Sequence, residues 1–345
     1  MSATDSADAP RPGRRAAVIA GIGSYVPPDV VTNDALTARL GTTDEWIRAR
    51  TGILTRHRVA PGIATSDLAV EAGQRALKSA GVSQADAVVL ATTTPDQPCP
   101  ATAPQVAARL GCTGAAAFDV SAVCTGFLYG LATASSLIAG GIADSVLLIA
   151  AEAFTTIVDP DDRHTAVLFG DGAGAVLLRA GTVGEPGATG PFVLGSDGGS
   201  SELIEVPAGG SRQRSARLPA GPGDTYLRMR GRDTYRHAVE RLTAASQQAA
   251  HGAGWNLADV DRFAAHQANA RIIAAVAERL SMPPQRLLSN VAQVGNTGAA
   301  SIPLLLSEAA ATGRLTVGHR VLLTAFGGGL TWGATTLTWP DITAG

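Results

Sequence analysis

The sequence contains few cysteines, few aromatic residues and few charged residues. Its 345 residues include 3 cysteines, 4% aromatic and 16% charged residues, and the formal net charge is −2. Lys78 is the only lysine, so arginine supplies nearly all of the positive charge. A chain with 46% hydrophobic residues and so little net charge is not intrinsically disordered. Because there is no basic excess, we expect no nucleic-acid partner.

The cysteines also lack the patterns that bind metals. Cys99, Cys112 and Cys124 form no CxxC pair and have no spacing typical of metal ligands, so we expect no metal site. A sparse, odd number of cysteines predicts a reduced protein in the cytoplasm. The segment FGDGAGAV at 169–176 lacks GxGxxG spacing, which favours a tight turn and no cofactor.

Neither a signal peptide nor a membrane span is expected. Residues 1–15 have no apolar core and are predicted to be a disordered N-terminal tail. Residues 120–143 carry no charge and are long enough to cross a bilayer. Serine, threonine and glycine dilute this stretch, however, and acidic residues flank it on both sides. We therefore predict a buried helix in a soluble protein without a membrane partner.

Short β-branched runs alternate with longer alanine-rich stretches, which predicts an α/β protein with helices packed on sheets. The expected strands are 17–22, 87–91, 116–120, 145–150, 173–178, 262–265 and 320–324. The expected helices are 67–80, 103–110, 124–139, 234–252, 269–280 and 302–312.

A faint internal repeat indicates two similarly folded halves. The passages ALKSAG–VSQAD–AVVLATTT and QQAAHGAG–WNLADV–DRFAAHQA share the order helix, Ala-Gly break, turn, strand and polar tip, although chance could produce this similarity. We expect an N-terminal half at 16–180 and a C-terminal half at 190–345. Proline and glycine concentrate at 207–223, which predicts an exposed loop or flap.

Cys124 is the first candidate for chemistry. It follows the strand-like AAFDV and opens the long uncharged helix. A thiol at a helix N-terminus lies near partial positive charge, which lowers the thiol pKa and makes a nucleophile. The alternative is a small buried thiol, which is the interpretation we favour for Cys99 and Cys112.

A histidine and an asparagine accompany this cysteine. His266 lies where the strand RFAA meets a helix, so it could act as an acid, base or hydrogen-bond donor, or it could be structural. Asn296 lies in VAQVGNTGAAS, a sequence that often only forms a turn. In AFGGGLTWG, backbone N–H groups near Gly328 could approach a ligand oxygen. One hypothesis is a papain-like thiol hydrolase, but the CG[SA]C[WY] signature of that family is absent.

Several motifs together resemble a family other than the papain-like thiol hydrolases. CTGF, HQANARI, GNTGAASIP and AFGGGLTWG resemble the β-ketoacyl-acyl carrier protein synthase III family, which has the thiolase fold. GIGSYVPPDVVTN, DEWIRARTGI, DPDDRHT and FGDGAGAV also resemble passages of that family, in the same order. The resemblance runs from about Ala17 to the C-terminus. It implies a thiolase-like α/β fold in which two similar halves pack as layered helices and sheets.

The resemblance implies an acyltransferase that joins an acyl-CoA starter to malonyl-acyl carrier protein by decarboxylative Claisen condensation. Cys124 would hold the acyl group, and His266 and Asn296 would stabilise the enolate left by decarboxylation. The N–H groups of Cys124 and Gly328 would form the oxyanion hole. The reaction would need no cofactor and would initiate either fatty acid or aromatic polyketide synthesis. Elongating ketosynthases use two histidines and thiolases a second cysteine, whereas chalcone synthases share the Cys-His-Asn set.

The resemblance also implies binding residues and partners. Those for coenzyme A are Trp46, Arg50, Arg163 and Asn269. Those for the acyl carrier protein are Gln267, Ala268, Asn269, Ala270 and Arg271. Cys99 and Phe326 would line the acyl pocket, with Cys99 reaching it across a homodimer. Two departures are His164, where the family often has glycine, and Glu278, where many members have a cation.

Two alternatives remain at this point. One is a thiolase-fold acyltransferase that does not condense, which the intact Cys-His-Asn set disfavours. The other is a non-catalytic scaffold that binds a carrier protein, which would not need Cys124.

Overall fold

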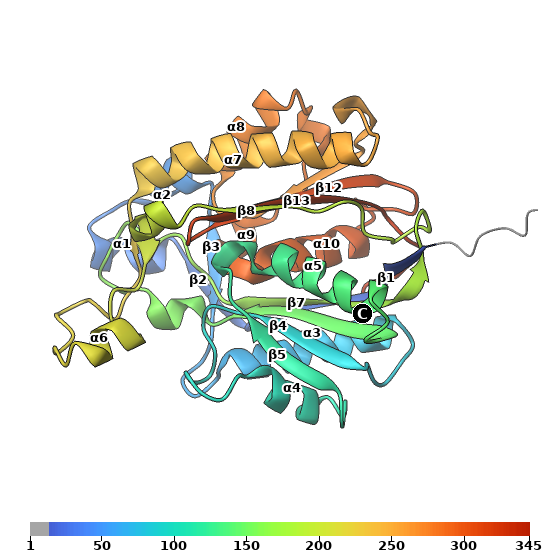
Figure 1. Ribbon diagram of the computed structural model, residues 1–345. Coiled ribbons are helices and arrows are strands. Elements are labelled where there is room, and N and C mark those ends of the chain that lie inside the picture. Colours follow the sequence, from blue (N-terminus) through green and yellow to red (C-terminus); the bar gives the residue numbers. More distant parts are fainter. Residues whose placement is uncertain (1–13) are drawn as a thin grey trace, which may run out of the picture.

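Two β-sheets form the framework of the protein. The computed structural model describes residues 14–345 (Figure 1). The first sheet has the strand order β1 (Arg15–Tyr25), β7 (Gly172–Thr182), β6 (Ser145–Glu152), β4 (Ala87–Ala91) and β5 (Ala116–Val120). The second has the order β11 (Arg262–Ala265), β12 (Arg320–Gly327), β13 (Thr331–Thr338) and β8 (Val193–Ser196). Each sheet therefore draws its strands from one half of the chain.

Both sheets mix parallel and antiparallel pairs. In the first sheet β4 runs parallel to β5 and β6, whereas β7 is antiparallel to both β6 and β1. In the second sheet β11 is parallel to β12, and β13 is antiparallel to β12 and β8. The parallel strands β4 and β11 are almost wholly buried, as expected where helices cover both faces.

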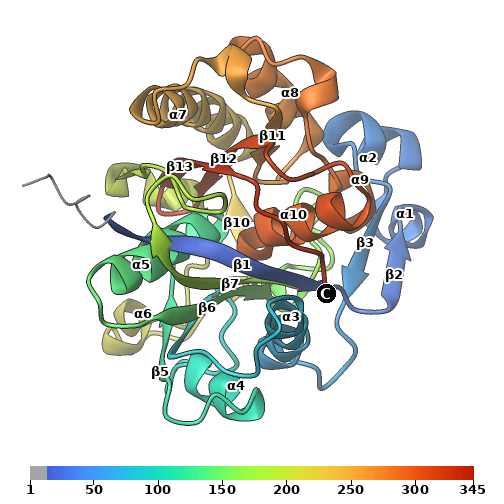
Figure 2. The ribbon, with the colours of Figure 1, turned by 90° about the vertical axis from the view of Figure 1, so that its right-hand side faces the viewer.

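Helices and sheets alternate in layers (Figures 1 and 2). Helices α7 (Gly231–Gly252) and α8 (Ala270–Arg279) lie outside the second sheet, and α3 (Thr65–Ser79) and α4 (Ala103–Arg109) lie outside the first. Helices α5 (Gly126–Ala139) and α10 (Ser301–Ala311) fill the space between the sheets. Their apolar side chains and those of both sheets form one core cluster.

Close contact between these layers depends on small residues. Gly174 on β7 lies against the start of α10, where a Cβ atom would come within 2.6 Å of the Leu304 backbone nitrogen. Any larger residue would push α10 away from the sheet. The layers also explain why the stretch 120–143 is uncharged. Its helix α5 lies between the sheets and buries Phe127, Leu131 and Ile138. Within the described residues, no helix is long and apolar enough to cross a membrane.

Shorter elements surround this framework. An antiparallel pair and two helices precede α3, namely β2 (Asp29–Thr32), α1 (Asp34–Leu40), α2 (Asp44–Thr51) and β3 (Thr55–Arg58). The pair β9 (Ile204–Glu205) and β10 (Arg228–Met229) flanks the segment that holds α6 (Ser211–Ser215). The short helix α9 (Val291–Val294) precedes the turn that carries Asn296. Single turns of 3-10 helix complete the chain, including Val123–Thr125 and Gly298–Ala300.

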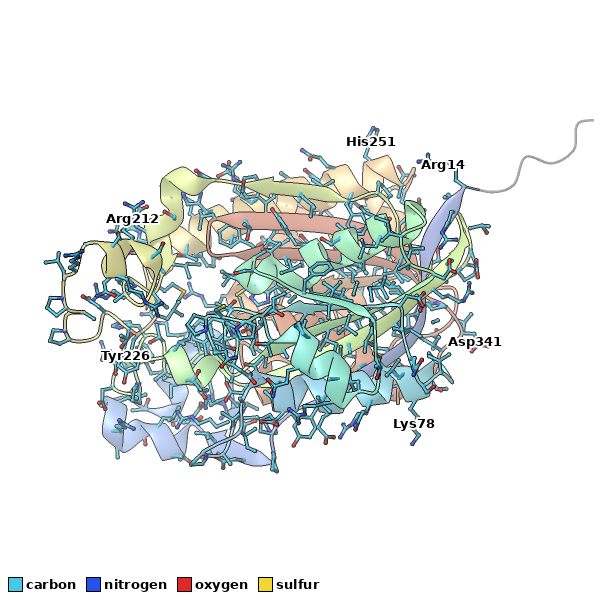
Figure 3. The ribbon with its side chains drawn as sticks, turned by 60° about the horizontal axis from the view of Figure 1, so that its bottom comes forward. Arg14, Lys78, Arg212, Tyr226, His251 and Asp341 are labelled. Atoms are coloured by element: carbon cyan, nitrogen blue, oxygen red, sulfur yellow. The ribbon has the colours of Figure 1, made fainter. Side chains whose placement is uncertain are left out.

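The expected exposed segment at 207–223 is confirmed. Most of its residues are exposed, and α6 is its only helix. Figure 3 shows Arg212 of α6 at the outer edge of the molecule, on the same side as Tyr226. This segment therefore lies beside the layered core without contributing to it.

Most of the expected elements are present, but some limits differ and several elements were not expected. The strands expected at 87–91, 116–120 and 262–265 are confirmed to the residue. The helix expected from Cys124 is wrong at its start, because Val123–Thr125 forms a 3-10 turn and α5 begins at Gly126. The long strand β13 and the shorter strands β2, β3, β8, β9 and β10 were not among the expected strands. Of the expected tail 1–15, residues 1–13 lie outside the described residues, and Arg15 already begins β1.

Candidate active site

One cavity brings the candidate groups together. It has a volume of about 670 Å³ and is lined by Cys124, His266 and Asn296. Its other predicted lining residues are Trp46, Arg50, Arg163, His164, Ala268, Asn269, Arg271 and Phe326. Cys124 comes from the first half of the chain and the other two groups from the second, so the cavity lies where the halves meet. Among residues 14–345 no cluster of three or more potential metal ligands occurs.

Cys124 lies in a tight turn after β5. The residue before it, Val123, has φ 47°, which is strained for a β-branched side chain. On the other side, a Cβ atom at Gly327 would lie 2.8 Å from the Cys124 nitrogen, so glycine is required where β12 ends. The turn is therefore held between the ends of strands from both sheets.

The expectation of a lowered Cys124 pKa is wrong. The side chain is 8% exposed, and burial raises its pKa to about 12, with a further contribution from the negative charge of Glu152. Burial disfavours the thiolate more strongly than the N-terminus of α5 favours it. In this structure the resting group is a neutral thiol.

His266 is buried at the end of β11. Its backbone N–H donates to the Thr324 carbonyl (2.8 Å), and its Nδ1 lies 2.5 Å from the Ser301 hydroxyl. Burial lowers the pKa of His266 to about 3, so the imidazole is neutral. When Ser301 donates to Nδ1, the ring proton is on Nε2, where it can be donated to a ligand.

Asn296 is fixed through its backbone and its side-chain oxygen. Its N–H donates to the Leu168 carbonyl (2.9 Å), and its own carbonyl accepts from Gly170 (3.0 Å). Its Oδ1 accepts from the Gly298 N–H (3.0 Å). Within the described residues its Nδ2 has no hydrogen-bond partner, so this donor is available in the cavity.

The two backbone donors expected for an oxyanion hole lie in adjacent turns. In the described part of the chain, the N–H groups of Cys124 and Gly328 donate to no other backbone carbonyl. Gly327 lines the cavity, and Gly328 is the next residue along the chain. Neither N–H group is therefore used by the backbone of residues 14–345, and Cys124 itself lines the cavity.

Cations and one aromatic ring gather at another part of the cavity. Two guanidinium groups lie close to the Trp46 ring, with Arg50 at 5.8 Å and Arg163 at 5.5 Å from its centroid. His164 is also exposed here, with Nδ1 3.2 Å from an Asp162 oxygen. This arrangement favours a ligand with a flat ring and negative charge.

Asn269 lies between these groups and α8. Its Oδ1 accepts from the Arg271 N–H (2.8 Å) and caps α8, and its Nδ2 donates to the Arg50 carbonyl (3.0 Å). The Oδ1 and Nδ2 atoms of Asn269 each have one further hydrogen-bonding position available to a ligand. Asn269 therefore joins α2 to α8 and also lines the cavity.

The predicted role of Gln267 in binding a carrier protein is wrong. Its side chain is fully buried, and Oε1 accepts hydrogen bonds from Ser289, Asn290 and Val291. Its Nε2 donates to the Ala265 carbonyl (2.7 Å). Gln267 therefore fixes the start of α9 and cannot contact another protein.

Two other predicted positions also lie outside the cavity. Ala270 packs against Gly52, where an added Cβ would lie 2.5 Å from the Ala270 Cβ. Cys99 is exposed in the loop after β4. Within one chain Cys99 does not line the cavity, so its expected role depends on a second copy.

Several lining residues were not identified from the sequence. Phe154 and Phe169 stack with centroids 4.5 Å apart and form an apolar wall. Arg232 and Tyr235 of α7 lie on the charged side, and Arg232 has no ion pair or hydrogen bond within residues 14–345. Outside the cavity lining, Glu152 was also not identified from the sequence, although it is a lone carboxylate at the end of the apolar run SVLLIAAE.

Comparisons with known proteins agree with this site. Models of the 3-oxoacyl-[acyl-carrier-protein] synthase III family match residues 118–198 and, for its C-terminal part, 250–339. The chain is 56% identical to β-ketoacyl-[acyl-carrier-protein] synthase III 5 of Streptomyces coelicolor, over 95% of this chain and 99% of that protein.

Solved structures give the same result. The crystal structure of 3-oxoacyl-(acyl carrier protein) synthase III from Pseudomonas aeruginosa PAO1 matches with TM-score 0.90 and 49% identity, over 95% of this chain and 99% of that one. The priming β-ketosynthase from the R1128 polyketide biosynthetic pathway matches with TM-score 0.88 and 33% identity, over 96% and 98%. The layered α/β fold is the thiolase-like fold that the sequence predicts, and the chain belongs to the 3-oxoacyl-[acyl-carrier-protein] synthase III family.

Proposed function

We propose that the protein is a condensing enzyme that joins an acyl-CoA starter to malonyl-acyl carrier protein with loss of carbon dioxide. The observation that carries the proposal is the meeting of Cys124, a neutral His266 and the free Nδ2 of Asn296 in one cavity. A thiol hydrolase would need a histidine that accepts a proton, and the low pKa of His266 disfavours that role.

In the first step, Cys124 sulfur attacks the thioester carbonyl of acyl-CoA. The N–H groups of Cys124 and Gly328 donate to the oxygen on which negative charge develops. The carbon–sulfur bond to coenzyme A breaks, and coenzyme A leaves as its thiol with the proton that Cys124 gave up. The acyl group remains on Cys124 as a thioester, so the difficult carbon–carbon bond formation is divided into two steps.

In the second step, malonyl-acyl carrier protein replaces coenzyme A. The malonyl carboxylate leaves as carbon dioxide, and its electron pair forms an enolate at the thioester. His266 Nε2–H and Asn296 Nδ2–H donate to the enolate oxygen, and as neutral groups they need no proton transfer to do so. The enolate carbon attacks the acyl carbonyl and the carbon–sulfur bond to Cys124 breaks. Cys124 leaves as a thiolate and takes up a proton from solvent, which restores the neutral thiol. The proposal includes no cofactor, because both thioesters are substrates.

Coenzyme A binds at the charged part of the cavity in this proposal. Its adenine stacks between Trp46 and Arg163, while Arg50 and Arg232 bind phosphate groups. The pantetheine arm passes Asn269 on its way to Cys124. His164 adds a further hydrogen-bonding group beside the adenine.

The carrier protein docks beside the same opening. A groove of about 480 Å³ between α7 and α8 is lined by Tyr235, Arg236 and Arg279, together with Glu278. Arg271 stacks over Tyr235 at 5.7 Å and connects this groove to the cavity. Three arginines suit an acidic partner, and Glu278 weakens this charge complementarity at one point.

The proposal includes a homodimer in the cytoplasm. β5 is the edge strand of the first sheet and is only half buried, and the nearby loop around Cys99 is exposed. An unpaired edge strand is a surface that a second copy can cover. Either fatty acid or aromatic polyketide synthesis remains compatible with this site.

The experiment that tests the function separates the two steps. Cys124→Ala should retain no radiolabel from acyl-CoA and should form no condensation product. His266→Ala and Asn296→Ala should still become labelled but lose condensation by about 100- to 1,000-fold, as expected for removal of one donor to a developing negative charge.

Three outcomes would contradict this proposal. Labelling of Cys124→Ala at the stoichiometry of the unmodified protein would show that Cys124 is not the nucleophile. Absence of label on the unmodified protein would favour a non-catalytic scaffold. Acyl transfer to an amine or hydroxyl without any condensation would favour the alternative acyltransferase.

A further inference from the structure

Glu152 is a buried carboxylic acid that the proposed reaction does not use. It ends β6, is fully buried, and forms no ion pair with any basic group of residues 14–345. Its carboxyl oxygens accept from the Thr93 N–H (3.0 and 3.1 Å) and from the Thr94 hydroxyl (3.0 Å). A buried charge without a counter-ion is costly, so such a group tends to keep its proton.

The carboxyl group contacts the turn that carries Asn296. Its Oε1 accepts from the Ala299 N–H (3.4 Å). A Cβ atom at Gly298 would lie 3.0 Å from the Glu152 Cγ, so the turn rests directly on this side chain. The same Gly298 N–H holds the Asn296 oxygen.

The turn that carries Asn296 also contacts the start of α5, close to Cys124. A Cβ atom at Gly126 would lie 3.0 Å from the Ala299 Cβ, and Gly126 is two residues after Cys124. The Glu152 charge raises the pKa of the Cys124 thiol, while burial raises the pKa of Glu152 itself to about 7. A negative charge on Glu152 therefore disfavours the Cys124 thiolate.

The groups around Glu152 can serve either protonation state. An ionised carboxylate accepts from the Thr94 hydroxyl, whereas a protonated one can donate to it. Thr94 can then donate to the Thr65 hydroxyl, 3.0 Å away, which itself donates to the Thr94 carbonyl. The remaining groups that face the carboxyl are the Thr92 hydroxyl and the Thr93 and Ala299 amides, all uncharged.

We propose that Glu152 is a positioning residue that controls formation of the Cys124 thiolate. The thiolate forms more readily while Glu152 carries its proton and is therefore neutral. Ionisation of Glu152 suppresses the thiolate, since two negative charges would then share one buried region. The importance of this control rests on the proposed role of Cys124 as nucleophile. No oxidant or second reactant is involved: each group only gains or loses a proton to solvent.

The test is the pH profile of Cys124 alkylation by iodoacetamide, with each modified cysteine identified by mass spectrometry. In the unmodified protein the rate should rise tenfold per pH unit until Glu152 ionises, near pH 7, and the profile should flatten there. In Glu152→Gln the rate should continue to rise without this flattening, so that at pH 8 it exceeds the unmodified rate by up to about tenfold.

A matched control separates this effect from loss of structure. Asp171 is also fully buried and is held by Thr155 and Val59, but it does not contribute to the Cys124 pKa. Asp171→Asn should therefore keep the flattened profile.

Parallel profiles for Glu152→Gln and the unmodified protein would overturn the proposal. If Glu152→Gln does not fold, Thr94→Val removes a donor that stabilises the ionised carboxylate and should move the flattening to higher pH. An unchanged profile in that variant would also overturn it. Alkylation requires neither coenzyme A nor a carrier protein, so failure of the proposed condensation would leave this result interpretable.

Discussion

His266 and Cys124 lie in the same cavity, and burial moves their pKa values in opposite directions. It lowers that of His266 to about 3 and raises that of Cys124 to about 12, so both groups are neutral at rest. A neutral imidazole donates one hydrogen bond from a fixed nitrogen without changing its charge. This state suits the stabilisation of an enolate better than acid–base catalysis.

The buried histidine predicts a specific dependence of stability on pH. The folded-state pKa of about 3 lies below the unfolded value of about 6.5, so the unfolded chain binds an extra proton between these values. Stability should therefore fall as pH decreases from 6.5. At pH 5 the loss from this group is about 2 kcal/mol relative to pH 8. His266→Asn lacks this titration.

Urea denaturation of both proteins between pH 5 and 8 measures this difference. The free energy of unfolding of the unmodified protein should fall more steeply with acid than that of His266→Asn. Equal slopes would show that His266 is hydrated in the folded protein.

At the scale of secondary-structure elements, the end of β6 and the residues after it shape the acyl site. Phe154 stacks on Phe169 and packs against Gly298, and both rings line the cavity near Cys124. Phe154→Leu removes part of this wall, and each methylene that gains apolar contact contributes about 0.8 kcal/mol. We expect this variant to raise kcat/KM for hexanoyl-CoA relative to acetyl-CoA by several-fold.

The control for this prediction is Phe263→Leu. Phe263 on β11 is equally buried but does not line the cavity. Its replacement should lower stability without changing the order of acyl-CoA substrates. The same change of order in both variants would mean that loosened packing, and not the Phe154 wall, controls chain length.

Elements formed by an uninterrupted run of apolar residues could be predicted from the sequence. Elements that mix apolar and polar residues could not. β4 and β11 are short apolar runs between polar residues, so their limits were found to the residue. β13 was missed because it buries Thr335 and Thr336, which satisfy no apolar pattern. Polar residues in a sheet are recognised only once their partners in space are known.

The site shows the same division. The motifs located Cys124, His266 and Asn296, because each follows a strand or forms a glycine-bounded turn. They could not show that Gln267 points into the core while Arg271, four residues later, faces the surface. The raised Cys124 pKa could not be predicted from the sequence either, since it depends on burial and on Glu152, which is distant along the chain.

At the scale of the whole molecule, the lack of charge in α5 does not require a second copy. Both sheets already cover this helix, so its apolar side chains are buried within one chain. The half-buried edge strand β5 and the exposed loop with Cys99 are the features that a partner would cover.

Dimer formation predicts an effect of Cys99 on the acyl pocket. Light scattering should give about twice the 34.9 kDa mass of the chain.

Because cysteine is small, the protein should use propionyl-, butyryl- or branched acyl-CoA at least as well as acetyl-CoA. Cys99→Phe should shift this preference toward acetyl-CoA. A chain mass of about 35 kDa across micromolar concentrations, or an unchanged preference in Cys99→Phe, would contradict the prediction.

The cavity that holds Cys124 also determines the order of events during turnover. The groups proposed for coenzyme A and those for the carrier protein meet at Arg271, so both pantetheine arms must occupy the same space in turn. Coenzyme A must therefore depart before malonyl-acyl carrier protein enters, which is a ping-pong mechanism. Free coenzyme A should inhibit competitively against malonyl-acyl carrier protein, and initial-rate plots at several acyl-CoA concentrations should give parallel lines. The rate of chain initiation would then fall whenever free coenzyme A accumulates.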